Sequence, residues 1–140
     1  MRLFNILMFT CLGLASTAAL ADYQSEKNQF NSTLDQFGIC TTTQLKTSSE
    51  SGDNSLSSCY KSLQDSLTAQ IKKIRLEKKV ALNEQTWKEV NLSHQRGVQS
   101  CAEISNSVAY SNFTGYLDSN CESIFYISLA QSAIELHYKK

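Results

Sequence analysis

Residues 55–74 read SLSSCYKSLQDSLTAQIKKI, and the spacing of the apolar side chains in this stretch decides the fold class. Apolar residues recur every three or four positions, as one face of an α-helix requires, and polar side chains fall between them. The predicted buried face carries Leu56, Cys59, Tyr60, Leu63, Leu67, Ile71 and Ile74, and the predicted outer face carries Lys61, Gln64, Asp65 and Lys72. The stretch is therefore an amphipathic helix of about five turns.

The chain on the N-terminal side of this helix predicts another helix and a loop. Tyr23, Phe30, Leu34 and Phe37 lie on one helical stripe, which predicts a helix over 23–37 with Gly38 as its left-handed C-terminal cap. Residues 41–54, TTTQLKTSSESGDN, are rich in side chains that compete with helical hydrogen bonds, so we expect a loop there.

On the C-terminal side, a second stripe runs from Val80 to about residue 109, and no Gly or Pro separates it from the first. One helix over 55–109 would be roughly 80 Å long, too long for a compact domain of this size. We therefore expect a reversal within 75–83, where Asn83 is a candidate N-cap.

Residues 110–117 predict the last connection, and Asp118 or Ser119 is the expected cap of a final helix. Proline is absent from all 140 residues, which favours helices throughout. The predicted fold is all-α: a small up-and-down bundle of about four helices.

The first 21 residues have the composition of a secretory signal peptide. Arg2 precedes an apolar run, and the segment ends in Ala19-Leu20-Ala21, the small-residue pattern that precedes cleavage. We expect residues 22–140 to form a single helical domain, periplasmic or secreted, with no stable membrane insertion after cleavage. Export also means an oxidising compartment, in which cysteines form disulfides.

The four cysteines of this domain are Cys40, Cys59, Cys101 and Cys121. With a reversal near residue 80, Cys59 and Cys101 lie at the same level of two antiparallel helices, while Cys40 follows the first helix and Cys121 begins the last. All four thiols thus gather at one end of the bundle. Two pairings are sterically reasonable: Cys40 with Cys59 plus Cys101 with Cys121, which we favour, or Cys59 with Cys101 plus Cys40 with Cys121.

The most concentrated charge lies at the predicted hairpin tip, at the end opposite the cysteines. This basic cluster consists of Lys72, Lys73, Arg75, Lys78 and Lys79, and it is a candidate docking site for an anionic partner. Nucleic acid is not expected, because the domain as a whole is not basic and no aromatic residues interleave with the cations. We expect Trp87, the sole tryptophan, to be a core anchor.

Catalytic and cofactor motifs are not found in the sequence. It has no nucleophile turn, glycine-rich phosphate loop or paired carboxylates, and His94 lies on an apolar stripe where packing is the expected role. No Cys-x-x-Cys occurs, so neither a metal nor a cofactor is expected. A non-enzymatic protein that binds another macromolecule is the class that remains.

The order of cysteines and aromatic residues over about 40–125 resembles the LprI-like lysozyme inhibitor family of small exported bacterial proteins. The positions that carry the likeness are Cys40, Cys59-Tyr60, the segment Leu82-Asn83-Glu84-Gln85-Thr86-Trp87, Cys101 and Cys121. The resemblance implies a helical, disulfide-bonded periplasmic protein whose partner is a lysozyme or another cell-wall hydrolase. Two other binding roles stay open: a periplasmic immunity protein against a secreted cell-wall toxin, and a structural envelope protein.

Overall fold

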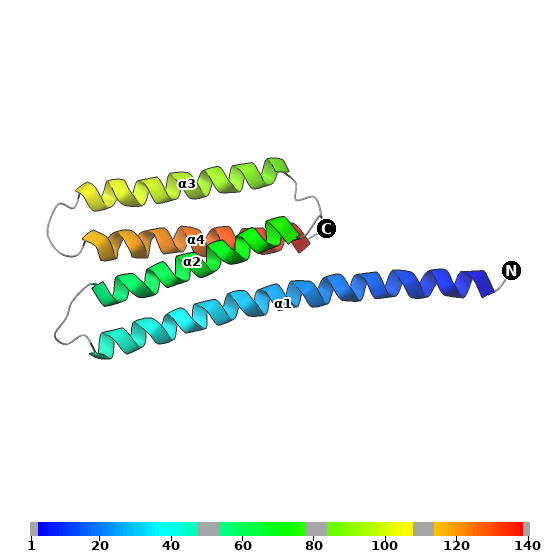
Figure 1. Cartoon of the computed structure of the whole chain (residues 1–140). Coiled ribbons are helices and arrows are strands. Elements are labelled where there is room, and N and C mark those ends of the chain that lie inside the picture. Colours follow the sequence, from blue (N-terminus) through cyan, green and yellow to red (C-terminus); the bar gives the residue numbers. More distant parts are fainter. Residues whose placement is uncertain (1–2, 48–53, 78–83, 108–113, 139–140) are drawn as a thin grey trace.

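The computed structural model describes residues 3–47, 54–77, 84–107 and 114–138, although not the side chains of residues 3–19, 54, 55, 77 and 114–117. Every element in these ranges is a helix (Figure 1): α1 (Leu3–Thr47), α2 (Asn54–Glu77), α3 (Glu84–Ser107) and α4 (Thr114–Tyr138). Consecutive helices run in opposite directions, so the predicted all-α, up-and-down architecture is confirmed.

α4 is the central helix of the bundle. It packs against each of the other three described helices, whereas α3 approaches α4 alone at the level of the backbone. The buried residues of α4 recur at helical spacing along one continuous face, among them Ser123, Leu129, Ala130 and Ile134. The bundle is therefore a compact set of α1, α2 and α4 with α3 attached along the side of α4 (Figure 1).

The core follows the stripe that the sequence predicted in α2. Leu63, Leu67 and Ile74 are at most 2% exposed, and they pack with Phe30 of α1 and Ile134 of α4. Burying a side chain of this size contributes about 1.5–3 kcal/mol. The periodic apolar face of one helix thus supplies the centre of the molecule.

Two disulfides fasten one end of the bundle, which we call the cysteine end. Cys40 is joined to Cys59, linking α1 to α2 with Cα atoms 5.9 Å apart, and Cys101 is joined to Cys121, linking α3 to α4 with Cα atoms 5.7 Å apart. Both Cα separations fall in the usual range for disulfides. Each bridge therefore closes one helical hairpin, as in the pairing that we favoured.

The first helix is much longer than the predicted 23–37, and the predicted loop over 41–54 is wrong for 41–47. The threonine hydroxyls in this stretch do not end the helix, because they bond back to its carbonyls and so are satisfied within it. Thr41 Oγ1 donates to Phe37 O at 3.1 Å, and Thr42 Oγ1 donates to Gly38 O at 2.7 Å. Gly38 is consequently an interior residue of α1, not a cap.

Boundaries elsewhere differ less from prediction. α2 begins one residue before the expected Ser55, and the reversal lies between Glu77 and Glu84, with Asn83, Lys78 and Lys79 outside the described residues. α4 begins at Thr114, so residues 114–117 are helical, and Asp118 and Ser119 are not its cap. Ser119 is already part of the helix, because its carbonyl accepts a 2.7 Å hydrogen bond from Ser123 Oγ.

Two isoleucines of the last two helices face solvent. Ile104 of α3 is 59% exposed and Ile124 of α4 is 62% exposed, whereas the polar Ser105 and Ser123 are buried. Because the backbone of α3 approaches that of α4 alone, its buried strip is narrow and runs through Trp87, Gly97 and Cys101 to Ser105. Ile104 is one residue away from this strip, so its side chain lies outside the contact between α3 and α4.

Candidate functional site

The polar side chains that meet across helices concentrate at the end of the bundle opposite the disulfides. We call this the distal end; it is formed by residues 23–27 of α1, residues 70–76 of α2, the start of α3 and residues 135–138 of α4. The predicted basic cluster begins here. The distal end is therefore the candidate site for contact with a partner.

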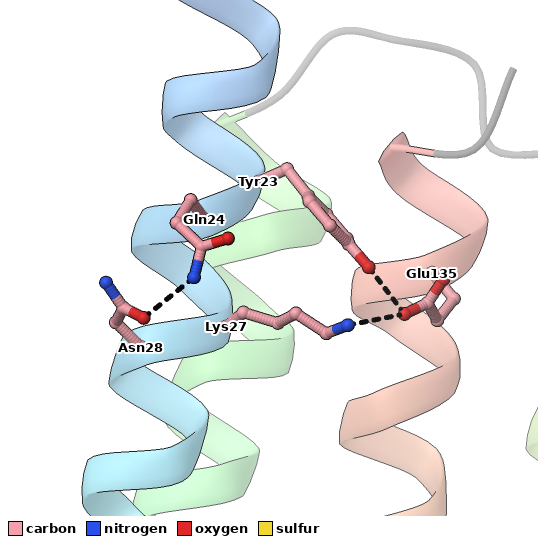
Figure 2. Close-up of polar contacts among 5 residues, drawn as sticks. All are labelled: Tyr23, Gln24, Lys27, Asn28 and Glu135. Carbon is pink, nitrogen blue, oxygen red and sulfur yellow. Dashed lines mark hydrogen bonds and ion pairs between the residues drawn. The ribbon is translucent and has the colours of Figure 1, made fainter.

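A tyrosine, a lysine and a glutamate join α1 to α4 at this end (Figure 2). Tyr23 OH donates to Glu135 Oε1 at 2.7 Å, and Lys27 Nζ lies 3.6 Å from the same oxygen. Lys27 Nζ also lies 5.1 Å from the centre of the Tyr23 ring. The hydrogen bond with Tyr23, followed by the charge of Glu135, raises the pKa of Lys27 above its ordinary value, so the ammonium form of Lys27 is favoured.

A buried carboxylate joins α1 to α2 one turn further along. Glu26 is 3% exposed, and Gln70 Nε2 donates to its Oε2 at 3.1 Å and to its backbone carbonyl at 2.8 Å. Lys73 Nζ lies 3.1 Å from Glu26 Oε1. Because a buried carboxylate without a partner costs several kcal/mol, Lys73 and Gln70 are what allow Glu26 to be buried here.

The third contact of the distal end joins α2 to the start of α3. Arg75 Nη2 lies 3.7 Å from Glu84 Oε2, and its guanidinium lies 4.8 Å from the centre of the Trp87 ring. Trp87 is 5% exposed and belongs to the core cluster, where the sequence placed it. Trp87 and Arg75 thus carry the contact between two helices whose backbones do not approach closely.

These contacts divide the predicted basic cluster. Lys73 and Arg75 each form an ion pair with an acid of another helix, so each of these cations already has an intramolecular partner. Lys72 is exposed and makes no ion pair with a described residue, and Lys78 and Lys79 lie outside the described residues. Of the three cluster cations that the structure describes, Lys72 is the one whose charge no described acid neutralises.

The two histidines occupy different surroundings from each other. His94 is half-buried with its ring 4.8 Å from that of Tyr126 on α4, which is a packing role. His137 is 6% exposed; its ring lies 5.0 Å from that of Tyr138, which in turn lies 5.5 Å from that of Tyr23. The C-terminal turn of α4 is buried because it packs against the start of the bundled part of α1.

Glu26, Gln70 and Glu135 were not identified from the sequence. Glu26 lies three residues after Tyr23 and four before Phe30, on the stripe that faces the bundle, and this register is the signal that was available. Such a register predicts that a polar residue is buried, and it does not identify the partner. The partner Lys73 is 47 positions away on another helix.

No group of three or more His, Cys, Asp or Glu side chains in the described ranges is arranged to hold a metal ion. Within the same part of the chain, no helix has both the length and the apolar character needed to span a membrane.

Comparison of the chain with protein-family models, with curated proteins and with solved structures finds no match. The two disulfides are typical of an oxidising environment outside the cytoplasm.

Proposed function

We propose that this protein is an exported, non-catalytic binding protein that docks the acidic surface of a protein partner at its distal end. The partner class that fits best is a lysozyme or another cell-wall hydrolase. The likeness of the cysteine and tryptophan positions to the LprI-like lysozyme inhibitors supports that choice. The single observation on which the proposal rests is Lys72, an exposed cation of α2 with no described acid beside it.

The position at which packing starts along α1 supports cleavage after Ala21. Leu20 is 66% exposed, and Ala21 and Asp22 are exposed as well, whereas Tyr23, the next residue along α1, packs against the core cluster. The part of α1 before this point projects away from the other helices (Figure 1). Leu20 and Ala21, the described side chains that precede the cleavage point, therefore lie outside the core.

The neighbours of Lys72 hold its backbone in one place. Ile71 is 8% exposed in the core, and Lys73 is tied to the buried Glu26, so the turn of α2 that carries Lys72 is anchored on both sides. A charge that is presented from a rigid helix loses less conformational entropy on binding than one on a mobile loop. Lys72 is thus a preorganised contact for an anionic partner.

An acidic cleft suits such a cation because lysozymes cleave glycosidic bonds with two carboxyl groups. An ammonium group that enters the cleft can form charge-assisted hydrogen bonds with those carboxylates and block substrate. The distal end can approach a cleft because it lies at one end of an elongated bundle (Figure 1). Inhibition by charge pairing needs no catalytic group on this chain.

A bacterial lysis assay with the purified, disulfide-bonded protein at micromolar concentration tests the proposal. The Lys72→Glu variant is compared with Lys61→Glu, which reverses an exposed lysine of the same helix near the cysteine end. We expect the unchanged protein to protect cells from at least one lysozyme class. Lys72→Glu should weaken protection at least about tenfold, the usual scale for an interfacial charge, and Lys61→Glu should not.

Two results would contradict the proposal. One is the absence of protection against every lysozyme class by the unchanged, folded protein. The other is equal potency of the Lys72→Glu and Lys61→Glu variants, which would remove the distal end from the contact. Circular dichroism of each variant establishes that its helix content is unchanged.

A further inference from the structure

One face of α1 near the cysteine end is not covered by any described helix. Leu34, Phe37 and Cys40 point toward the bundle, whereas Asp35, Gly38, Ile39, Thr42 and Lys46 are exposed on the opposite side. A shallow surface depression is lined by residues of this face, and Ile39 within it is 67% exposed. We call this the outer face of α1.

The charges at the two ends of the outer face are opposite. Asp35 lies at one end and Lys46 at the other, 11 positions or about 16 Å apart along the helix axis. Neither makes an ion pair with another described residue. An acidic end and a basic end on one helix face are complementary to the same face running in the opposite direction.

We infer that the outer face of α1 is a dimer interface, and that its partner is the same face of a second copy of this chain, packed antiparallel. A two-fold axis beside residues 40 and 41 sets Asp35 of each copy opposite Lys46 of the other. The same axis sets Ile39 of each copy opposite Thr42 of the other. Each contact then occurs twice, as a two-fold interface requires.

The centre of the outer face can be covered by a second helix at low cost. A Cβ added to Gly38 would meet no atom within 4 Å, so the surface there is open enough for a close approach. The hydroxyl of Thr42 already donates to Gly38 O, so covering it buries no unpaired donor. Ile39 would leave water, which supplies the apolar part of the driving force.

The dimer leaves the proposed binding surface free. The two-fold axis lies near the cysteine end, so the distal ends of two antiparallel copies point in opposite directions. Each copy would therefore present its own Lys72 to a partner. The inference does not depend on the partner's identity.

Sedimentation equilibrium of the disulfide-bonded protein over a range of concentrations tests the dimer, with a charge-swap series to test its geometry. Asp35→Lys and Lys46→Asp each place like charges opposite one another at both ends of an antiparallel interface. Each single change should raise the dimer Kd about tenfold or more, the scale of two ion pairs turned repulsive. The double change Asp35→Lys/Lys46→Asp should restore the original Kd.

Asp65→Lys is the matched control, because Asp65 is an exposed aspartate of α2 that makes no described ion pair. It should leave the Kd unchanged. A protein that stays monomeric up to about 1 mM would overturn the inference, since even weak specific pairs form there. So would a dimer that is insensitive to the single changes, or one that the double change does not restore.

Discussion

At the scale of single residues, Gly97 sets how closely α3 and α4 approach. A Cβ at this position would overlap the ring of Phe125 on α4. Alanine normally stabilises a helix interior by about 1 kcal/mol relative to glycine. At residue 97 we expect the opposite: Gly97→Ala should destabilise the protein by about 1–3 kcal/mol, because the ring must move out of its packed position.

Gly38→Ala is the control for this prediction, because a Cβ there would meet nothing within 4 Å. It should stabilise the protein by up to about 1 kcal/mol. Urea unfolding of dilute protein measures both changes. Equal signs for the two variants would show that Phe125 does not restrict the position of Gly97.

The buried Glu26 makes the loss of Lys73 costly. Lys73→Met leaves a carboxylate that is 4% exposed without its cation, and we expect a loss of about 2 kcal/mol. Lys72→Met, at the neighbouring exposed position, should change stability by less than about 0.5 kcal/mol. The double variant Glu26→Gln/Lys73→Met should recover most of the loss, since no charge is then buried.

These effects can be measured together by thermal and urea unfolding. A Lys73→Met variant as stable as Lys72→Met would contradict the structural role of the Glu26–Lys73 pair. It would also return Lys73 to the set of cations available to a partner.

Glu122 provides a pH-dependent test. Burial, followed by the charge of Asp118, raises the pKa of Glu122 above its ordinary 4.5, while the hydrogen bond from Gln64 lowers it. The folded state therefore holds the Glu122 proton more tightly than the unfolded state does. The resulting penalty is absent below the unfolded pKa and appears as the pH rises through the folded pKa.

Glu122→Gln removes this penalty. It should stabilise the protein at pH 7 by no more than about 0.5 kcal/mol, since Glu122 is only partly buried and solvent screens its charge, and the gain should vanish near pH 4. Asp65→Asn, at an exposed aspartate, should show no such pH-dependent gain. The free energies of unfolding of both variants at the two pH values test this prediction. A stability gain of Glu122→Gln that grows on acidification would contradict the raised pKa of Glu122.

At the scale of elements, the sequence predicted α2 well because the spacing of its apolar residues alone determines which face is buried. Its apolar residues recur in helical register, and Leu63, Leu67 and Ile74 are buried as that register requires. The end of α1 was not predictable in the same way. Whether Thr41 and Thr42 compete with a helix or bond back to it depends on the conformation of the chain, and residue type does not decide this.

The candidate site was harder to predict than the helices. A run of cations in the sequence does not show which acids meet it, because Glu26 and Glu84 come from other helices. Buried polar residues such as Gln70 and His137 were missed, since type alone assigns them to the surface. Helical register locates a face, while tertiary contact decides which charges remain available.

At the scale of the whole molecule, the two disulfides hold unequal parts of the bundle. Each closes a loop of about 20 residues and contributes on the order of 3 kcal/mol in the chain-entropy model. At the level of the backbone α3 approaches α4 alone among the described helices, and its contact with α2 is limited to side chains such as Trp87 and Arg75, whereas α1 packs on both α2 and α4. The Cys101–Cys121 bridge is therefore the main covalent restraint on α3.

Replacing Cys101 and Cys121 by serine should consequently loosen α3 and leave the α1, α2 and α4 set folded. Hydrogen exchange should show lost protection over residues 84–107 with protection retained over 56–76. Replacing Cys40 and Cys59 by serine should spare α3. Equal loss of protection in all helices of the first variant would show that α3 is not a separable unit.

The central claim is that the protein is exported, cleaved after Ala21 and cross-linked at one end, which leaves the distal end to bind a partner. The intact mass of the protein isolated from its native host tests this most directly. The account predicts the mass of residues 22–140 less four hydrogens, for two disulfides. A chain that retains residues 1–21, or one that carries four free thiols among Cys40, Cys59, Cys101 and Cys121, would contradict it.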